Sequence, residues 1–188
     1  TNAPYGIAKK TLMQLLISYR EQYSFNAINL VPVNMYGQCD NFNPDSSHVI
    51  PALIRKFHEA KVQDQHEDVS VWGTGNASRE FLYVDDCARA IIMATEKHND
   101  PQPVNIGTGV EITIKDLTEK ISDCMAYNGK IIWNTDKPDG QPRRCLDTSK
   151  AKKLFGFEAT TDFDTGLKKT VQWFKDKVTI LDDNWHSI

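Results

Sequence analysis

The stretch Phe25-Asn26-Ala27-Ile28-Asn29-Leu30-Val31 has the composition of a buried β-strand that ends toward Gly37. The residues before it predict an amphipathic helix over about 4–23, because apolar side chains recur there at helical spacing, namely Ala8, Leu12, Leu15, Leu16 and Tyr19. After it, a polar loop from 40 to 47 leads into a second helix over about 48–60. The stretch therefore reads as a strand between two helices.

The same alternation continues along the rest of the chain. Further strands are predicted at 69–72, 80–84, 104–106 and 130–133. Further helices are predicted at 85–97, at about 113–127 with Thr113 as its cap, at 148–149 onward, and at about 164–177. Alternating strands and helices predict an α/β protein.

Composition excludes several classes of protein. Of 188 residues, 40% are hydrophobic, which is enough to build a core. Lys and Arg number 22 against 25 Asp and Glu, so the net charge of −3 offers no broad positive field to a nucleic acid. There is no run of about eighteen apolar residues that would span a membrane, and the first ten residues, TNAPYGIAKK, do not resemble a secretory signal.

The cysteines and glycines predict no metal site and no complete dinucleotide turn. The thiols are widely spaced, which favours neither zinc nor disulfides but reduced thiols in a cytoplasmic protein, at Cys39, Cys87, Cys124 and Cys145. Gly73-Thr74-Gly75 and Gly107-Thr108-Gly109 both lack the third glycine of G-x-G-x-x-G, so we interpret them as turns.

The pair Tyr5 and Lys9 is the sharpest chemical signal. Residues four apart share one face of a helix. A lysine ammonium about 4 Å from a tyrosine hydroxyl favours the phenolate by a few kcal/mol in a partly screened site, which would make that hydroxyl an acid-base group near neutral pH. From spacing alone, a Tyr and a Lys on an ordinary helix surface is the more frequent explanation.

Eight segments from 4 to 143 carry a resemblance to a known family. They are P-Y-G-I-A-K (4–9), P-V-N-M-Y-G (32–37), D-N-F (40–42), S-H-V-I-P-A-L-I-R-K-F-H-E-A (47–60), V-W-G-T-G (71–75), R-E-F-L-Y-V-D-D (79–86), N-I-G-T-G (105–109) and K-P-D-G-Q-P-R (137–143). The chain resembles the extended short-chain dehydrogenase/reductase superfamily over residues 2 to about 174. Within it, the chain is similar to the GDP-4-keto-6-deoxymannose epimerase-reductases that make GDP-L-fucose.

The resemblance implies a role for each matching residue. Tyr5 would protonate the C4 oxygen during reduction, and Lys9 would favour its phenolate form and hold the nicotinamide ribose. His48 would exchange the acidic protons at C3 and C5, which flank the C4 ketone. The segment beside the nicotinamide of NADP(H) would be Pro32, Val33, Asn34 and Met35, with Tyr5, Lys9 and His48 also at the cofactor. The GDP-sugar would be bound by Lys56, Trp72, Arg79, Lys137, Asp139 and Arg143.

Each of these residues also has a structural explanation. His48 could cap or pack the helix that it starts, Trp72 could belong to the core, and Arg79 could form a surface pair with Glu80. Asp85 and Asp86 suit the start of a helix, and we assign them no catalytic role. Cys39 lies near His48 in sequence, but it does not match the family's cysteine, and we assign it none either.

The resemblance also implies an incomplete enzyme. Members of the family begin with about 130 further residues that carry the glycine-rich turn, the first strands and the catalytic serine and cysteine. We therefore expect a fragment that lacks the N-terminal Rossmann half. Residues 1–36 and 84–108 would be the second half of the NADP-binding parallel sheet, 37–83 and 109–180 a smaller α/β substrate domain, and 181–188 a tail.

Two classes of function follow from this organisation. One is NADPH-dependent 3,5-epimerisation and 4-reduction of GDP-4-keto-6-deoxy-D-mannose, or a colitose-type reaction on a related GDP-sugar, in a homodimer of longer chains. The other is a non-catalytic nucleotide-sugar-binding or dimerisation fragment. We expect no turnover by the chain alone, because a helix behind a glycine-rich turn is what binds the cofactor phosphates.

Overall fold

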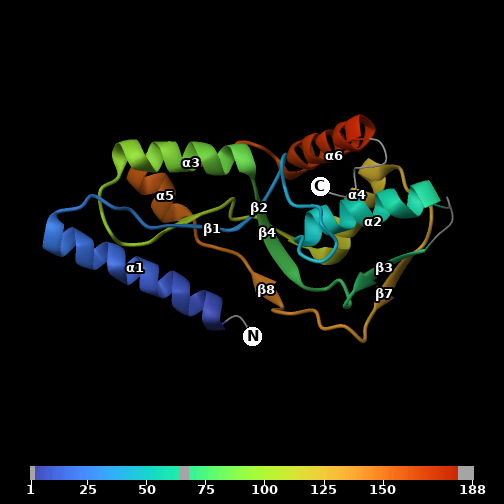
Figure 1. Cartoon of the computed structure of the whole chain (residues 1–188), viewed down its shortest axis with the longest axis horizontal. Coiled ribbons are helices and arrows are strands. Elements are labelled where there is room, and N and C mark those ends of the chain that lie inside the picture. Colours follow the sequence, from blue (N-terminus) through green and yellow to red (C-terminus); the bar gives the residue numbers. More distant parts are fainter. Residues whose placement is uncertain (1–2, 64–67, 182–188) are drawn as a thin grey trace.

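The computed structural model describes residues 3–63 and 68–181 (Figure 1). Its helices are α1 (Ala3–Tyr23), α2 (Val49–Gln63), α3 (Val84–Lys97), α4 (Ile114–Met125), α5 (Ser149–Phe155) and α6 (Phe163–Leu181). Its strands are β1 (Leu30–Pro32), β2 (Asn34–Tyr36), β3 (Val69–Trp72), β4 (Ser78–Tyr83), β5 (Val104–Ile106), β6 (Glu111–Thr113), β7 (Ile131–Asn134) and β8 (Arg143–Arg144). The predicted α/β class is confirmed, and α1, β3, β5 and α5 lie close to their predicted places.

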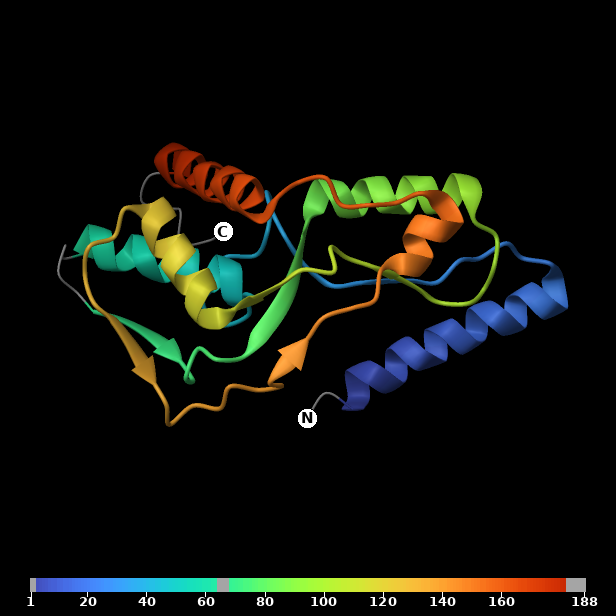
Figure 2. The ribbon, with the colours of Figure 1, turned by 180° about the vertical axis from the view of Figure 1, so that it is seen from behind.

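One half of the fold is built on the parallel pair β1 and β5, in which Leu30 lies opposite Val104. Buried side chains from this pair, from α3 and from α5 form one apolar cluster, with members such as Ala90, Ile106 and Phe155. Figure 2 shows α3 and α1 on opposite sides of the β1 segment. Parallel pairing with helices on both sides is the arrangement of a Rossmann-type sheet.

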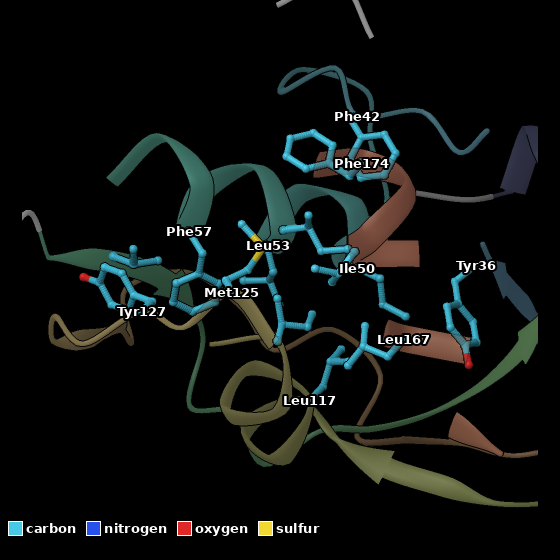
Figure 3. Packing of buried hydrophobic residues seen from close by; sticks show 14 of the residues in the cluster. Tyr36, Phe42, Ile50, Leu53, Phe57, Leu117, Met125, Tyr127, Leu167 and Phe174 are labelled. Carbon is cyan, nitrogen blue, oxygen red and sulfur yellow. The ribbon is translucent and has the colours of Figure 1, made fainter. Parts of the chain in front are cut away.

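The other half packs three helices against short strands. Side chains of α2, α4 and α6 meet in a second, larger cluster, labelled in part in Figure 3: Tyr36, Phe42, Ile50, Leu53, Phe57, Leu117, Met125, Tyr127, Leu167 and Phe174. The parallel strands β3 and β7 border this cluster, and Val69 and Val71 of β3 are buried in it. Burial of these large side chains, each contributing about 1.5–3 kcal/mol, fixes the helices against the strands.

Strand β4 joins the two halves. It pairs in parallel with β2 and β8 and antiparallel with β6. Side chains alternate between the faces of a strand, so Leu82 packs in the β1–β5 cluster while Phe81 and Tyr83 pack in the larger one. A single strand therefore fixes the position of one half against the other.

The structure corrects the strand expected at 25–31. That segment begins its sheet pairing only at Leu30, and a second strand, β2, follows at Asn34. The backbone changes partner at Val33, whose N–H donates to the Ile106 carbonyl at 2.9 Å before β2 turns to β4. One apolar run thus serves two sheets, which the sequence pattern does not separate.

Two short strands, β6 and β8, lie where no strand was predicted. They pair with the first residues of β4, at Ser78 to Glu80. The predicted domain boundaries stay a prediction. Helix α5, which they assign to the substrate domain, packs in the β1–β5 cluster through Ala151 and Phe155. The expected tail lies outside the described residues apart from Leu181, where α6 ends. None of the described helices is long and apolar enough to cross a membrane.

Candidate active site

A cavity of about 300 Å³ brings together six of the predicted site residues. We call it the His48 cavity, and its predicted members are Asn34, Met35, His48, Trp72, Arg79 and Asp139. Its remaining walls are apolar and come from the first turn of α2, from β4 and from α4. A larger hollow of about 590 Å³, beside Tyr36 and Phe163, contains none of the predicted residues. The gathering of predicted residues, rather than size, identifies the candidate site.

His48 stands at the entrance to α2, where its carbonyl accepts the Ala52 N–H at 2.9 Å. Its backbone therefore begins the helix, while its side chain lines the cavity. Burial raises the pKa of the Asp40 carboxyl, and the nearby His48 imidazole opposes this rise. The Oδ1 atom of Asp40 accepts the Asn41 N–H at 2.7 Å, so the loop before α2 is held by its own polar side chains.

Trp72 is exposed, which rules out the core interpretation. The alternation of β3 buries Val69 and Val71 and leaves the Trp72 ring 63% exposed. Two ammonium groups lie near the ring centroid, Lys56 Nζ at 5.8 Å and Lys137 Nζ at 5.5 Å. Lys56 also donates to the Ser70 carbonyl at 3.0 Å, and burial lowers its pKa against the opposing charge of Glu59. The surface around Trp72 combines an aromatic face with positive charge.

Arg79 does not form a surface pair with Glu80. Its guanidinium donates to the carbonyls of Ser78 at 2.7 Å and Gln141 at 2.6 Å, and a longer contact of 3.4 Å reaches the Asp139 carbonyl. Arg79 thus joins β4 to the 137–142 loop. Adjacent residues of a strand point to opposite faces, and Glu80 accordingly turns into the protein.

Glu80 is a buried residue whose role the sequence analysis missed. It is 1% exposed, and its carboxylate accepts the N–H groups of Thr108 at 2.6 Å, Gly109 at 2.7 Å and Leu146 at 2.7 Å. Its own carbonyl accepts the Asn34 side-chain amide at 3.3 Å. Three backbone donors satisfy the buried charge, so Glu80 fixes the turn after β5. The sequence signal that could have identified it is the R-E-F segment at 79–81, which is part of the family resemblance.

Asp139 and Arg143 lie in different surroundings, although both were predicted to bind the GDP-sugar. The Asp139 carboxylate accepts the Thr74 N–H at 2.6 Å and the Thr74 hydroxyl at 2.7 Å. These hydrogen bonds lower its pKa. Arg143 forms an ion pair with Glu111 at 2.9 Å and lines a different hollow, beside α4. The structure does not bring Arg143 into the His48 cavity.

The predicted cofactor segment is divided between the core and the cavity. Pro32 is exposed, and Val33 is buried in the β1–β5 cluster. Asn34 and Met35 line the His48 cavity, with Met35 45% exposed. Only the side chains of Asn34 and Met35 are therefore placed to meet a ligand there.

Tyr5 and Lys9 lie together but apart from the lining of the His48 cavity. The Lys9 ammonium is 5.3 Å from the centroid of the Tyr5 ring, as helical spacing predicts. The Tyr5 side chain is 68% exposed. None of the α1 residues, all of which the structure describes, is buried. The Tyr5–Lys9 pair is therefore formed within α1. Its distance from the His48 imidazole depends on what packs against α1.

Comparison with known proteins assigns the chain to a family. Residues 1–107 match the model of the NAD dependent epimerase/dehydratase family, and the chain belongs to it. It is similar to a probable GDP-L-fucose synthase 1 of Oryza sativa subsp. japonica, with 43% identity over 95% of this chain and 54% of that protein. A GDP-L-fucose synthase of Escherichia coli K12 is also 43% identical, over 93% and 56%.

A solved structure shows the same fold. The crystal structure of a GDP-L-fucose synthetase from Naegleria fowleri bound to NADP matches with a TM-score of 0.88 and 29% identity, over 95% of this chain and 57% of that one. The chain therefore spans about half the length of the relatives that it matches.

Proposed function

We propose that the protein containing this chain is an NADPH-dependent enzyme that epimerises GDP-4-keto-6-deoxy-D-mannose at C3 and C5 and reduces it at C4, forming GDP-L-fucose. The observation that carries the proposal is the His48 cavity, which joins an imidazole to an aromatic, cationic surface at Trp72. The similarity to GDP-L-fucose synthases supports the same substrate.

The surface around Trp72 suits the nucleoside diphosphate. Ammonium groups of Lys56 and Lys137 provide positive charge for the diphosphate oxygens, and the exposed Trp72 ring provides a flat apolar face for a base or a sugar. Arg79, whose guanidinium lies between β4 and the 137–142 loop, adds a cation to the lining of the His48 cavity. The whole chain has a net charge of −3, but this site gathers three cations, Lys56, Lys137 and Arg79.

His48 is the group that we propose for proton exchange at C3 and C5. The carbon acids beside a ketone lose a proton to a base, and a neutral imidazole is suited to this near neutral pH. Its place at the cavity wall, next to the apolar residues Ile50 and Pro51, leaves room for the sugar.

Tyr5 and Lys9 are the residues that we propose for reduction. Tyr5 would deliver a proton to the C4 oxygen, and Lys9 would favour the phenolate form that remains. NADPH, when bound, supplies the hydride to C4. The residues present fit its nicotinamide end, since Met35 and Asn34 line the cavity beside His48 and the Lys9 ammonium is exposed next to Tyr5. Lys9 would hold the ribose hydroxyls.

We also propose a homodimer in the cytoplasm, in which α1 contributes to the subunit interface. Its exposed apolar side chains support this role, among them Ile7, Leu12, Leu15, Tyr19 and Tyr23. Four free cysteines suit a reducing compartment. Equilibrium sedimentation of the full-length protein tests the dimer, and a monomer would contradict it.

The test of the function supplies GDP-4-keto-6-deoxymannose and NADPH to the full-length protein and, separately, to the 188-residue chain. We expect the full-length protein to consume NADPH and form GDP-L-fucose, and the chain alone to be inactive. Turnover without inversion at C3 and C5 would instead identify a simple 4-keto reductase. The stereochemistry of the product separates the fucose reaction from a colitose-type reaction.

A further inference from the structure

The 137–142 loop is held to the rest of the chain by polar contacts alone. Every residue from 135 to 144 is exposed, so no buried side chain anchors it. Its contacts with β4 are the Arg79 bonds to the Gln141 carbonyl at 2.6 Å and to the Asp139 carbonyl at 3.4 Å, and the Ser78 N–H bond to the Pro142 carbonyl at 2.9 Å. A loop without apolar anchoring takes its position from such hydrogen bonds.

Asp139 provides the contact between this loop and the turn after β3. Its two carboxylate oxygens are taken up by the backbone N–H and the hydroxyl of Thr74, at 2.6 and 2.7 Å. The approach is close enough that a Cβ atom added at Gly73, whose φ is +83°, would overlap the Asp139 carboxylate. The 73–75 turn and the loop are therefore shaped to meet at this point.

Charge argues that Asp139 does not bind the diphosphate directly. A carboxylate facing a diphosphate is repelled by it unless a cation or hydrogen-bond donors intervene. The Asp139 carboxylate instead accepts hydrogen bonds from Thr74, in the turn after β3. The same loop carries Lys137, whose ammonium lies 5.5 Å from the Trp72 ring centroid.

We propose that Asp139 is a positioning residue, which through Thr74 fixes the 137–142 loop so that the Lys137 ammonium stays at Trp72 for a nucleoside diphosphate. Thr74 thus becomes part of the binding site without touching the ligand. The part of this inference that concerns the ligand rests on the proposed function, whereas the part that concerns the loop does not.

Two measurements on the 188-residue chain test the inference. The first is hydrogen exchange of backbone amides without ligand. We expect Asp139→Asn to accelerate exchange at Thr74 and, because the loop is released, at Ser78, each by about tenfold. The Gly73 amide, which donates to the Asn134 carbonyl at 2.8 Å, is the internal control and should not change. Unchanged exchange at Ser78 would overturn the inference.

The second measurement is calorimetric titration with GDP. We expect Asp139→Asn to weaken binding about tenfold and Thr74→Val, which keeps the N–H donor, about threefold. Thr74→Ser should bind as the original chain does. The double variant should bind like Asp139→Asn alone, because both changes break one contact.

The alternatives give different results. A loss in Asp139→Asn without any in Thr74→Val, or additive losses, would show that Asp139 contacts GDP itself and would overturn the inference. If the unaltered chain shows no GDP binding while exchange responds as expected, the ligand part of the inference fails and the loop contact stands; turnover by the full-length protein then decides the proposed function separately.

Discussion

The helix that carries Tyr5 and Lys9 and the region that carries His48 and Trp72 are held in opposite ways. Helix α1 has no buried residue, and large apolar side chains such as Tyr5 and Ile7 are exposed along it. Helix α2 buries Ile50, Ile54 and Phe57 almost completely. One region is fixed by the core of the described chain, and the other is not.

The difference teaches how the two proposed chemistries are divided. His48, Lys56, Trp72 and Arg79 lie on or directly before elements that pack in the larger cluster, whereas Lys137 lies on the exposed 137–142 loop. The groups for reduction lie on α1, whose large apolar side chains are exposed. The residue pair on α1 is correctly spaced by the helix itself, but its distance from His48 depends on what packs against α1.

The largest expected effect is on C4 reduction and concerns α1. Tyr5→Phe removes only the hydroxyl of a 68% exposed side chain, so stability should be unchanged. In the full-length protein, the rate of C4 reduction should fall by about 10² to 10⁴ because the general acid is lost. NADPH consumption measures it, and Tyr19→Phe, on the same helix, is the matched control. If Tyr5→Phe retained the rate of C4 reduction, the Tyr5–Lys9 pair would not have the proposed role.

The next effect tests the cavity side. His48→Gln in the full-length protein should slow deuterium uptake from solvent at C3 and C5 by about 10²-fold while C4 reduction survives. Mass spectrometry of the sugar nucleotide detects the exchange. His58→Gln, ten positions further along α2, is the control for disturbance of the helix. Normal exchange in His48→Gln would clear this imidazole of the role.

A smaller effect tests the contact between the two halves. Asp86, at the start of α3, accepts from Arg89 at 2.6 Å and from the Thr161 N–H at 2.8 Å. Burial opposes its ionisation, but these hydrogen bonds outweigh burial and lower the pKa of Asp86 from 3.8 to about 2. The ionised form therefore contributes about 2 kcal/mol of stability above pH 4, which is lost as the pH falls toward 2.

Asp86→Asn should accordingly reduce the free energy of unfolding at pH 7 by about 2 kcal/mol, and make it less dependent on pH between 4 and 2. Urea unfolding at a series of pH values measures both. The exposed neighbour Asp85 provides the control variant, Asp85→Asn. Equal destabilisation by the two changes would mean that the contact with 160–161 does not join the halves.

The smallest effect sharpens the description of the Trp72 surface. Lys56→Met should weaken GDP binding to the chain by about threefold to tenfold, because one cation near the ring is lost. The loss should diminish at high salt. Lys153→Met, at an exposed position on α5, should bind GDP normally. A salt-independent loss would indicate packing rather than charge.

The sequence predicted the fold well wherever local patterns decide it. Strand β3 lies at 69–72 as predicted, and Thr113 caps α4 by accepting the Asp116 N–H at 3.0 Å. The short strands β6 and β8 were missed, because two or three residues of pairing depend on which strand is nearby rather than on propensity. The same reason hides the change of partner at Val33.

Six of the predicted site residues line one cavity, but the sequence did not indicate the contacts that they make. The resemblance named Asp139 and Arg79, yet both contact other parts of the chain. Glu80 was considered only as a possible surface partner of Arg79, and it is buried with three backbone donors. Such contacts join segments far apart in the chain, so spacing within one segment does not reveal them.

Titration of the 188-residue chain with GDP and, separately, with NADPH tests the contrast between the two regions most directly. We predict saturable binding of GDP that Trp72→Leu removes, because Trp72, Lys56 and Arg79 lie on elements that pack in the larger cluster. We predict no binding of NADPH, because these residues contain no glycine-rich turn and α1 is not held by buried contacts. Binding of NADPH without binding of GDP would contradict the account.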